Sequence, residues 1–153
     1  MGCDIHAFAE KKIEGGYVHV HLHPPLFDWR WYGLFAFLAG VRNYSAVTPI
    51  AQPRGLPKDL SSGIRSIYED DISQHTESWL DVKELLDFNY EASFEDRRER
   101  RQLAPNLFSG AETADVGKGL VKTYRDFIGL SYFEELERLK MVGVDRIVFW
   151  FDN

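Results

Sequence analysis

Arg146-Ile-Val-Phe-Trp-Phe-Asp-Asn153 ends the chain, and Met1-Gly-Cys-Asp-Ile-His6 begins it. The closing stretch holds two phenylalanines and a tryptophan, although chain ends are usually frayed and dispensable. We therefore expect the C-terminal stretch to be a strand buried inside the fold. The opening stretch is also typical of a strand, so the sequence predicts that both ends belong to one sheet and lie side by side.

Three polar side chains would then be carried on rigid strands, namely Asp4, His6 and Asp152. If the two terminal strands adjoin, the imidazole lies near one or both carboxylates. A carboxylate orients an imidazole and raises its basicity, which suits acid–base catalysis or metal binding. A structural histidine that is hydrogen-bonded to an aspartate at a strand end is the alternative interpretation.

The composition is typical of a soluble globular protein. The 153 residues are 44% apolar and 14% aromatic, which predicts a single domain over residues 1–153 with a sizeable core. The net charge of −6 argues against general nucleic-acid binding, because phosphate-binding surfaces are usually basic. No apolar run approaches the ~20 residues of a membrane span, and the opening residues lack the features of a signal peptide. We expect a cytoplasmic protein.

A hairpin is predicted near the N-terminus, because Gly15-Gly16 tolerates the positive φ of a tight turn and lies between two alternating segments. A two-residue loop at these glycines would pair Glu14 with Tyr17 and place Glu10 opposite His21. In this register the apolar faces of the two strands coincide, as a half-buried hairpin requires.

The second strand of this hairpin carries His19, His21 and His23 on one face. Neutral imidazoles bind divalent metals such as zinc, iron or nickel, so Glu10, His19 and His21 are weak candidates for a metal site. The spacing matches no zinc-binding motif. A solvated polar face that happens to be rich in histidine is the alternative.

The order of elements predicts an α+β fold. Helices are expected over Tyr32–Val41, over 81–88 after the capping box Asp81-Val-Lys-Glu84, over the charged segment 91–103, and over Ser131–Val142. Residues 43–66 and 105–119 are expected to be irregular, and Val121–Gly129 suits either a strand or a helix. The predicted fold is a small mixed or antiparallel sheet that includes both terminal strands and packs with three to four helices.

The core of this fold is predicted from the apolar positions of the expected elements. These are Ile5, Val20, Leu34, Phe35, Leu38, Leu85, Leu136, Leu139, Val148 and Trp150.

Several motifs together resemble a family of small proteins common in bacteriophages and prophages. Besides the two chain ends, they are Asp28-Trp-Arg-Trp-Tyr-Gly-Leu-Phe-Ala-Phe-Leu-Ala-Gly-Val-Arg-Asn43, Pro53-Arg-Gly-Leu-Pro57 and His75-Thr-Glu-Ser-Trp-Leu80. The resemblance covers most of the chain and departs from the family at residues 17–23 and 91–130. It implies a phage accessory protein that acts in the cytoplasm of the bacterial host, and it supplies no chemistry.

A binding module is the first functional hypothesis. Arginine forks bind phosphate or carboxylate, and tryptophan or tyrosine rings can stack on a base. We expect a small anionic ligand, including a nucleotide, or a host protein, whose binding counters a bacterial process such as defence. The predicted binding residues are His6, Trp31, Arg42, Asn43, Arg54, His75 and Trp79.

Two rival hypotheses stay open. One is a metal-assisted hydrolase that uses Asp4, His6 and Asp152 and needs a divalent metal as its cofactor. The other is a structural or host-protein-binding component of the phage. A Ser-His-Asp triad of His75, Ser78 and Asp81 is disfavoured, because no Gly-x-Ser-x-Gly elbow is present and Asp81 is better explained as a helix cap.

Overall fold

The computed structural model describes residues 2–153, and the chain divides into two compact units. The first, here called the sheet unit, comprises residues 2–30, 53–88 and 130–153. The second, here called the hairpin unit, comprises residues 31–52 and 89–129. The single domain expected over residues 1–153 stays a prediction.

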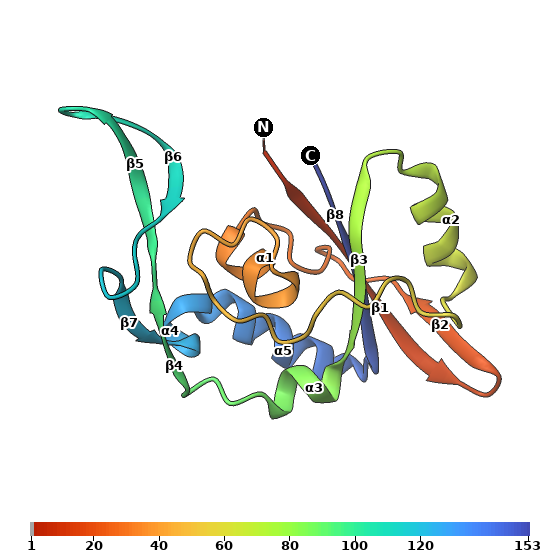
Figure 1. The fold of residues 1–153 in the computed structure, drawn as a ribbon. Helices are drawn as coiled ribbons and strands as arrows, with labels where there is room; N and C mark the ends of the chain where they lie inside the picture. Colours follow the sequence, from red (N-terminus) through yellow and green to blue (C-terminus); the bar gives the residue numbers. More distant parts are fainter. Residues whose placement is uncertain (1) are drawn as a thin grey trace. The chain divides into compact units, whose positions relative to one another are not determined.

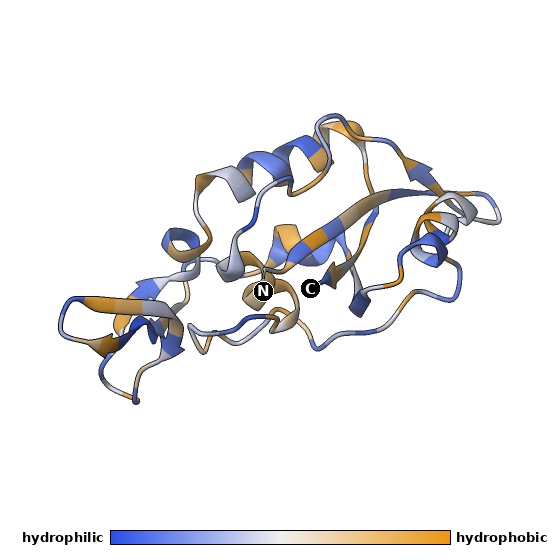
Figure 2. Ribbon diagram, turned by 90° about the horizontal axis from the view of Figure 1, so that it is seen from above, coloured by the Kyte–Doolittle hydropathy of each residue, from blue (hydrophilic) through white to orange (hydrophobic). Residues whose placement is uncertain are grey.

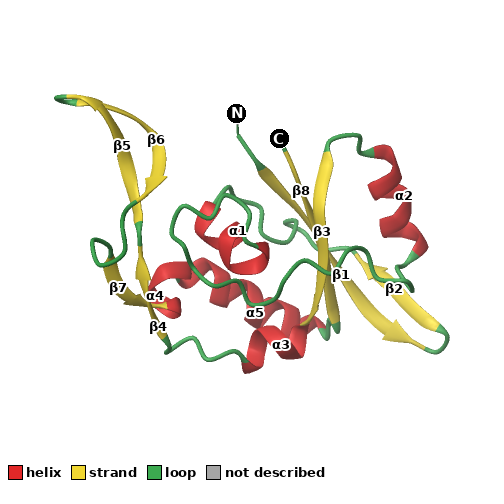
Figure 3. Ribbon diagram, viewed as in Figure 1, coloured by secondary structure: helices red, strands yellow, loops and turns green. Residues whose placement is uncertain are grey.

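The sheet unit is built on a four-stranded antiparallel sheet in the order β2-β1-β8-β3 (Figure 3). Its strands are β1 (Asp4–Ile13), β2 (Gly16–Val20), β3 (Gln74–Asp81) and β8 (Arg146–Asp152). The two terminal strands pair directly, with Asp4 opposite Asp152 and Glu10 opposite Arg146. This confirms the α+β fold and the prediction that both chain ends belong to one sheet.

Helices cover both faces of this sheet. Figure 1 places α2 (Ser62–Asp70) on one side of the sheet, and α3 (Val82–Asp87) and α5 (Leu130–Val142) on the other. The central strand β8 is therefore buried on both faces, and its residues 147–151 are fully buried. On the α2 side, Ile64 of the helix packs with Val148 and Trp150 of β8. Eight of the ten predicted core residues are buried, whereas Ile5 and Val20 are only half-buried.

The two helices predicted at 81–88 and at Ser131–Val142 are present. Helix α3 follows the capping box, in which Glu84 accepts a hydrogen bond from the backbone N–H of Asp81 at 2.9 Å. Helix α5 ends before Gly143, whose φ of 78° suits glycine at a helix end. Its buried residues are Tyr132, Leu136 and Leu139. The sequence pattern thus located both helices, although Tyr132 is more buried than the expected Phe133.

The predicted hairpin register is wrong by two residues. The turn lies at Glu14-Gly15, so that Ile13 pairs with Gly16 and Glu10 lies opposite His19 instead of His21. Gly15 has a φ of 85° and occupies the second turn position, where a positive φ is required. Because side chains alternate with a period of two, this shift leaves the faces of the strands unchanged.

The hairpin unit contains helices and short two-stranded sheets. Its elements are α1 (Tyr32–Ala39), β4 (Ser93–Asp96), β5 (Arg98–Ala104), β6 (Leu107–Thr113), β7 (Leu120–Thr123) and α4 (Tyr124–Ile128). Strand β4 pairs with β7, and β5 pairs with β6. The β5–β6 hairpin is exposed along almost its whole length, and Figure 2 shows hydrophobic and hydrophilic residues mixed along it. Helix α1 agrees with its prediction and ends at Gly40, which has a φ of 73°.

Several local predictions in this part of the sequence are wrong. The charged segment 91–103 forms β4 and β5 instead of a helix, and the expected loop over 105–119 contains β6. Hydrogen bonds of Arg97 with the backbone of Ser45 and Ala114 hold the chain between β4 and β5, so tertiary contacts override helix propensity. Pro105-Asn106 forms the hairpin turn, with Asn106 at a φ of 64°.

Three other segments differ from the sequence-based prediction or decide between its alternatives. The segment expected to be irregular over 43–66 includes the beginning of α2, and β3 forms where no strand was predicted. The ambiguous segment 121–129 contains both alternatives, since β7 ends where α4 begins. Thr123 marks the boundary, because its hydroxyl accepts a hydrogen bond from the N–H of Asp126 at 3.1 Å.

A buried ion pair fixes one end of the β1–β8 pair. Arg146 is 3% exposed and donates from Nε to the carboxylate of Glu10, which is 0% exposed, at 2.7 Å. The N–H of Ser61 donates to the other carboxylate oxygen at 2.7 Å, and Asp59 accepts from Arg146 at 2.7 Å. Burial opposes the charge of Arg146, but Asp59 and Glu10 outweigh it and raise the pKa of the guanidinium. The network ties both terminal strands to the segment before α2.

Removal of the last five residues is expected to abolish folding, because it deletes most of a strand that is hydrogen-bonded on both edges and buried on both faces. Circular dichroism during heating should show no cooperative transition for the truncated chain. A chain that lacks Asn153 alone is the control and should melt cooperatively. A soluble, cooperatively melting chain ending at Val148 would contradict the prediction.

Replacement of Glu10 by leucine should lower the free energy of unfolding by about 3–5 kcal/mol, because it leaves a buried guanidinium without its partner. Urea unfolding measures this change. The double variant E10L/R146M should recover most of the loss, since an apolar pair leaves no buried charge. Lys83→Ala breaks the exposed Lys83–Asp87 pair and serves as a control, with an expected loss of about 0.5 kcal/mol or less.

Candidate functional site

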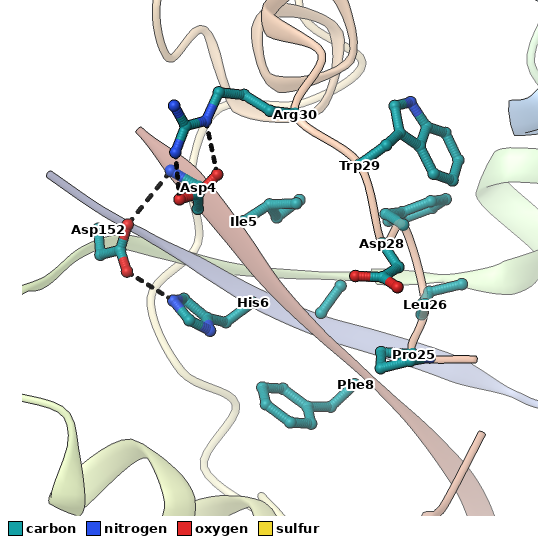
Figure 4. Close-up of a pocket in the computed structure, with 12 residues that line it drawn as sticks. Asp4, Ile5, His6, Phe8, Pro25, Leu26, Asp28, Trp29, Arg30 and Asp152 are labelled. Atoms are coloured by element: carbon teal, nitrogen blue, oxygen red, sulfur yellow. Dashed lines mark hydrogen bonds and ion pairs between the residues drawn. The ribbon is translucent and has the colours of Figure 1, made fainter. Parts of the chain in front are cut away.

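The pairing of the two terminal strands brings Asp4, His6 and Asp152 together. Nε2 of His6 lies 2.8 Å from Oδ2 of Asp152, and the backbone N–H of Asp4 donates to Oδ1 of the same carboxylate at 3.2 Å. All three side chains share one face of the sheet, because Asp4 and Asp152 are cross-strand partners and His6 is two residues from Asp4. The predicted juxtaposition of an imidazole with carboxylates is therefore present (Figure 4).

Arg30 is part of this site, although sequence reasoning did not select it. Its guanidinium donates two hydrogen bonds to the carboxylate of Asp4, at 2.7 and 2.6 Å. This bidentate contact lowers the pKa of Asp4. The pair neutralises Asp4 and closes one end of the site, as Figure 4 shows.

His6 is oriented by contacts on both sides. Its ring stacks on Trp150 at a centroid distance of 6.2 Å, and the indole N–H of Trp150 donates to Asp71 at 3.0 Å. The His6 side chain is 39% exposed, and within residues 2–153 its Nδ1 has no hydrogen-bond partner. When Nε2 donates to Asp152, Nδ1 is an acceptor. A molecule in the site could therefore give a proton or a hydrogen bond to His6.

A cleft of about 520 Å³ opens beside these residues. It lies between β1 and the segment Pro25–Arg30 (Figure 4). Its apolar lining includes Phe8, Leu26, Phe27 and Trp29. The far wall is firmly held, because Phe27 is 1% exposed, packs against the Tyr132 ring and donates its backbone N–H to Glu135 at 3.1 Å. This volume is in the range of small-molecule sites, about 300–1,000 Å³.

Among the residues that line the cleft, Arg30 is the only arginine or lysine, whereas Asp4, Asp28 and Asp152 carry carboxylates. Arg30 is paired with Asp4, and His6 is hydrogen-bonded to Asp152. Asp28 lines the same cleft, and Figure 4 shows its carboxylate directed toward the β1 side. In the part of the chain that the structure describes, Asp28 has neither a hydrogen bond nor an ion pair. The local charge therefore favours a cationic or hydrogen-bond-donating ligand over an anionic one.

A second pocket, here called the basic pocket, contains two of the predicted binding residues. Arg54 and Trp79 line this cavity of about 570 Å³ together with Tyr17, Lys58 and Arg146. The guanidinium of Arg54 lies 4.8 Å from the Trp79 ring centroid and donates two hydrogen bonds to Glu84, at 2.9 and 2.6 Å. The hydrogen bonds that Glu84 accepts raise the pKa of Arg54. Both arginines of this pocket are thus already matched with carboxylates.

His75 lies on the opposite face of the sheet from His6. It pairs with Phe151, the residue before Asp152, so its side chain leaves β3 on the other side. Its Nε2 lies 2.8 Å from the side-chain oxygen of Asn153, and its Nδ1 lies 2.8 Å from the Thr76 hydroxyl. Thr76 has a φ of 56° at a bulge in β3, which is a strained conformation for a β-branched residue. The structure does not bring the two histidines into one site.

Trp31, Arg42 and Asn43 belong to the hairpin unit, and each makes contacts within it. Asn43 exchanges two hydrogen bonds with the backbone of Val47, at 2.8 and 3.0 Å, which is a structural role in a turn. Arg42 lies 6.0 Å from the Tyr32 ring centroid. Trp31 lies 6.5 Å from the Phe127 ring centroid. Within the hairpin unit, these three residues therefore have structural contacts of their own.

The weak metal candidates do not form a donor set. Both carboxylate oxygens of Glu10 are occupied by Arg146 and Ser61. The rings of His19 and His21 lie 4.0 Å apart, and burial, together with His21, lowers the pKa of His19. Within residues 2–153, no group of three or more histidine, cysteine, aspartate or glutamate side chains is arranged to hold a metal ion.

Comparisons of the chain with protein-family models, with curated proteins and with solved structures found no match. In the described chain, no helix is both long enough and apolar enough to cross a membrane. Function is therefore inferred from the geometry of the cleft and from its charges.

Glu84→Gln should weaken the acid dependence of stability. Arg54 holds the pKa of Glu84 below its ordinary value of 4.5, so the folded state binds this proton less readily than the unfolded state. The stabilisation is present above about pH 4.5 and is lost as the pH falls through the lower folded value. Urea unfolding at about pH 7 and about pH 3.5 should show a smaller difference in the variant. The same substitution at exposed Glu137 is the control, and an unchanged difference in E84Q would contradict the prediction.

Proposed function

We propose that the protein binds a small ligand in the cleft between β1 and Pro25–Arg30, and that this ligand combines a cationic or hydrogen-bond-donating group with a flat apolar part. The observation that carries the proposal is the carboxylate of Asp28, which has no partner in the described chain and lies in a cleft that holds two further carboxylates but one guanidinium, that of Arg30 on Asp4. A cation bound beside Asp28 would compensate that charge.

The lining of the cleft supports both parts of such a ligand. Phe8 and Trp29 line the cleft, so a flat apolar group would gain contact area against aromatic side chains. His6 offers its Nδ1 as an acceptor. Asp152 and Trp150 fix the His6 ring in advance, so little conformational entropy is lost when the ligand binds.

An enzyme is the alternative function of the same cleft. Its lining contains no serine, threonine, cysteine or lysine, so hydrolysis there would use a water molecule activated by His6. Asp152 would orient the imidazole, and Asp4, held by Arg30, would position Asp152 through its backbone N–H. The metal-assisted form of this hypothesis lacks support from the donor set, because Asp4 is engaged by Arg30 through both oxygens.

The basic pocket is a second candidate site, and it suits the small anion or nucleotide expected from the sequence. The observation in its favour is Lys58, which has no ion pair within residues 2–153 and lines the pocket with the rings of Tyr17 and Trp79. An anion there would compete with Glu84 for Arg54. A role of either site in countering host defence rests on the resemblance to phage proteins.

Benzamidine, a flat aromatic cation, is expected to bind the cleft, whereas benzoate, an anion of the same shape, is not. Titration followed by ¹H–¹⁵N NMR should shift the amide signals of residues 4–8 and 28–30 with benzamidine. Asp28→Asn should weaken this binding about tenfold, because it removes a charge-assisted hydrogen bond. Asp70→Asn, at an exposed site on α2, is the control.

The two probes also separate the two candidate sites. Benzoate shifts confined to Arg54, Lys58 and Trp79 would favour anion binding in the basic pocket. Benzamidine that leaves residues 4–8 unshifted, or that binds D28N equally well, would overturn the proposal for the cleft.

A further inference from the structure

Strand β1 is paired over different lengths on its two edges. On one edge it pairs with β8 from Asp4 to Glu10. On the other edge it pairs with β2 only from Ala9 to Ile13. The edge of Asp4–Phe8 that faces away from β8 therefore has no neighbouring strand, and this edge borders the cleft.

The register shows which backbone groups this open edge presents. Ile13 and Gly16 flank a two-residue turn, so Ile13 directs its N–H and C=O toward β2, and every second residue of β1 does the same. The intervening residues face β8, as the hydrogen bond from the N–H of Asp4 to Asp152 confirms. Ile5 and Ala7 consequently direct their N–H and C=O groups away from β8, where no strand of the described chain receives them.

These backbone groups line the cleft, where Ile5 is half-buried. Ala7 is 8% exposed, and the segment Pro25–Arg30 forms the opposite wall. Enclosed N–H and C=O groups without partners cost free energy, so they are satisfied by water or by a ligand. Edge strands are usually protected by charges, proline or a covering element that pairs with them. Here the covering segment leaves a gap instead.

We propose that an extended peptide segment carrying a basic side chain binds in this gap and adds to β1 as a further strand of the sheet. The inference rests on the proposed function, because it identifies the ligand of the same cleft. Ile5 and Ala7 exchange backbone hydrogen bonds with the peptide, and Asp28 pairs with its lysine or arginine. Strand addition of this kind takes its affinity from the main chain and its specificity from alternate side chains.

The geometry limits the length of the bound segment. Arg30 and Asp4 close one end of the cleft, and Phe8 and Pro25 lie at the other. The five residues of the open edge span about 17 Å at the usual rise of a strand. Phe8 and Trp29 face the side chains of the peptide, and the acidic lining selects a basic residue over an acidic one.

The experiment uses the capped pentapeptide acetyl-Thr-Val-Arg-Val-Thr-amide and two isomers that are N-methylated along one edge or the other. N-methylation along the edge that faces β1 removes the donors, whereas methylation along the outer edge leaves them intact. We expect the parent peptide to shift the amide signals of Ile5 and Ala7 saturably. One isomer should lose at least about tenfold in affinity and the other should bind nearly as well as the parent.

A protein variant provides an independent test. Ala7→Pro removes an outward N–H but no bond to β8, and proline is tolerated at a strand edge. It should weaken the peptide at least about tenfold, and cooperative melting of A7P shows that the loss is not one of folding. Lys11→Pro removes an N–H that is bonded to β2 and serves as the contrasting substitution, with loss of stability instead. If A7P fails to fold, the affinities of the two methylated isomers alone test whether the peptide binds by strand addition.

The outcomes separate this inference from the function on which it rests. Benzamidine binding without peptide binding, or equal affinity loss in both isomers, would overturn strand addition and leave the cleft as a small-molecule site. If neither probe shifts residues 4–8, both proposals fail. If sedimentation shows that the free protein is a dimer whose interface protects the amides of Ile5 and Ala7, the edge belongs to a second copy and the peptide proposal is overturned.

Discussion

Antiparallel pairing of β1 with β8 is the constraint on which the sheet unit depends. It joins the two ends of the chain, and it places a fully buried strand between β1 and β3. The face shared with α2 changes in character along this ladder. Glu10 and Arg146 form the buried ionic end, Phe8 and Val148 the apolar middle, and Asp4 and Asp152 the polar end beside the cleft. A shift of register would separate buried charges, which costs several kcal/mol, so the ionic end also fixes the alignment of the site.

The site follows from the different lengths of neighbouring strands. Strand β2 ends at Val20 and the chain turns away at Pro24-Pro25, so half of β1 has no partner on that side. The returning segment Pro25–Arg30 is anchored by Phe27 against Tyr132 and by Arg30 on Asp4. Phe27 thus holds the segment against α5, while Arg30 joins its end to β1, and the cleft lies between the segment and the strand. The cleft, its unmatched Asp28 and the unpaired groups of Ile5 and Ala7 are all consequences of this one arrangement.

The sequence was most informative where apolar pattern and local caps act together. The burial of the last strand and the capping box at Asp81 were visible because aromatic clustering and side-chain capping are local signals. The juxtaposition of His6 with Asp152 followed from the adjacency of the terminal strands. The role of Arg30 could not be deduced in this way, because its contact with Asp4, 26 positions away in the sequence, depends on how the loop after β2 returns. The β5–β6 hairpin was missed because its arginines and glutamates suit a helix, although Pro105-Asn106 was an available turn signal.

Several polar residues that are conspicuous in the sequence have partners in the structure. Arg146 donates to both Glu10 and Asp59, and Arg54 donates to Glu84 while it lies over the Trp79 ring. Asn43 hydrogen-bonds the backbone within a turn. In the sequence these residue types are typical of ligand sites, whereas in the structure their contacts have a structural role. A carboxylate and two backbone positions without partners, gathered in one cleft beside an oriented imidazole, are exceptions to that pattern. Asp28 is exposed and the two backbone positions line the cleft, and together they match the donors and acceptors of the extended basic peptide that we propose as its ligand.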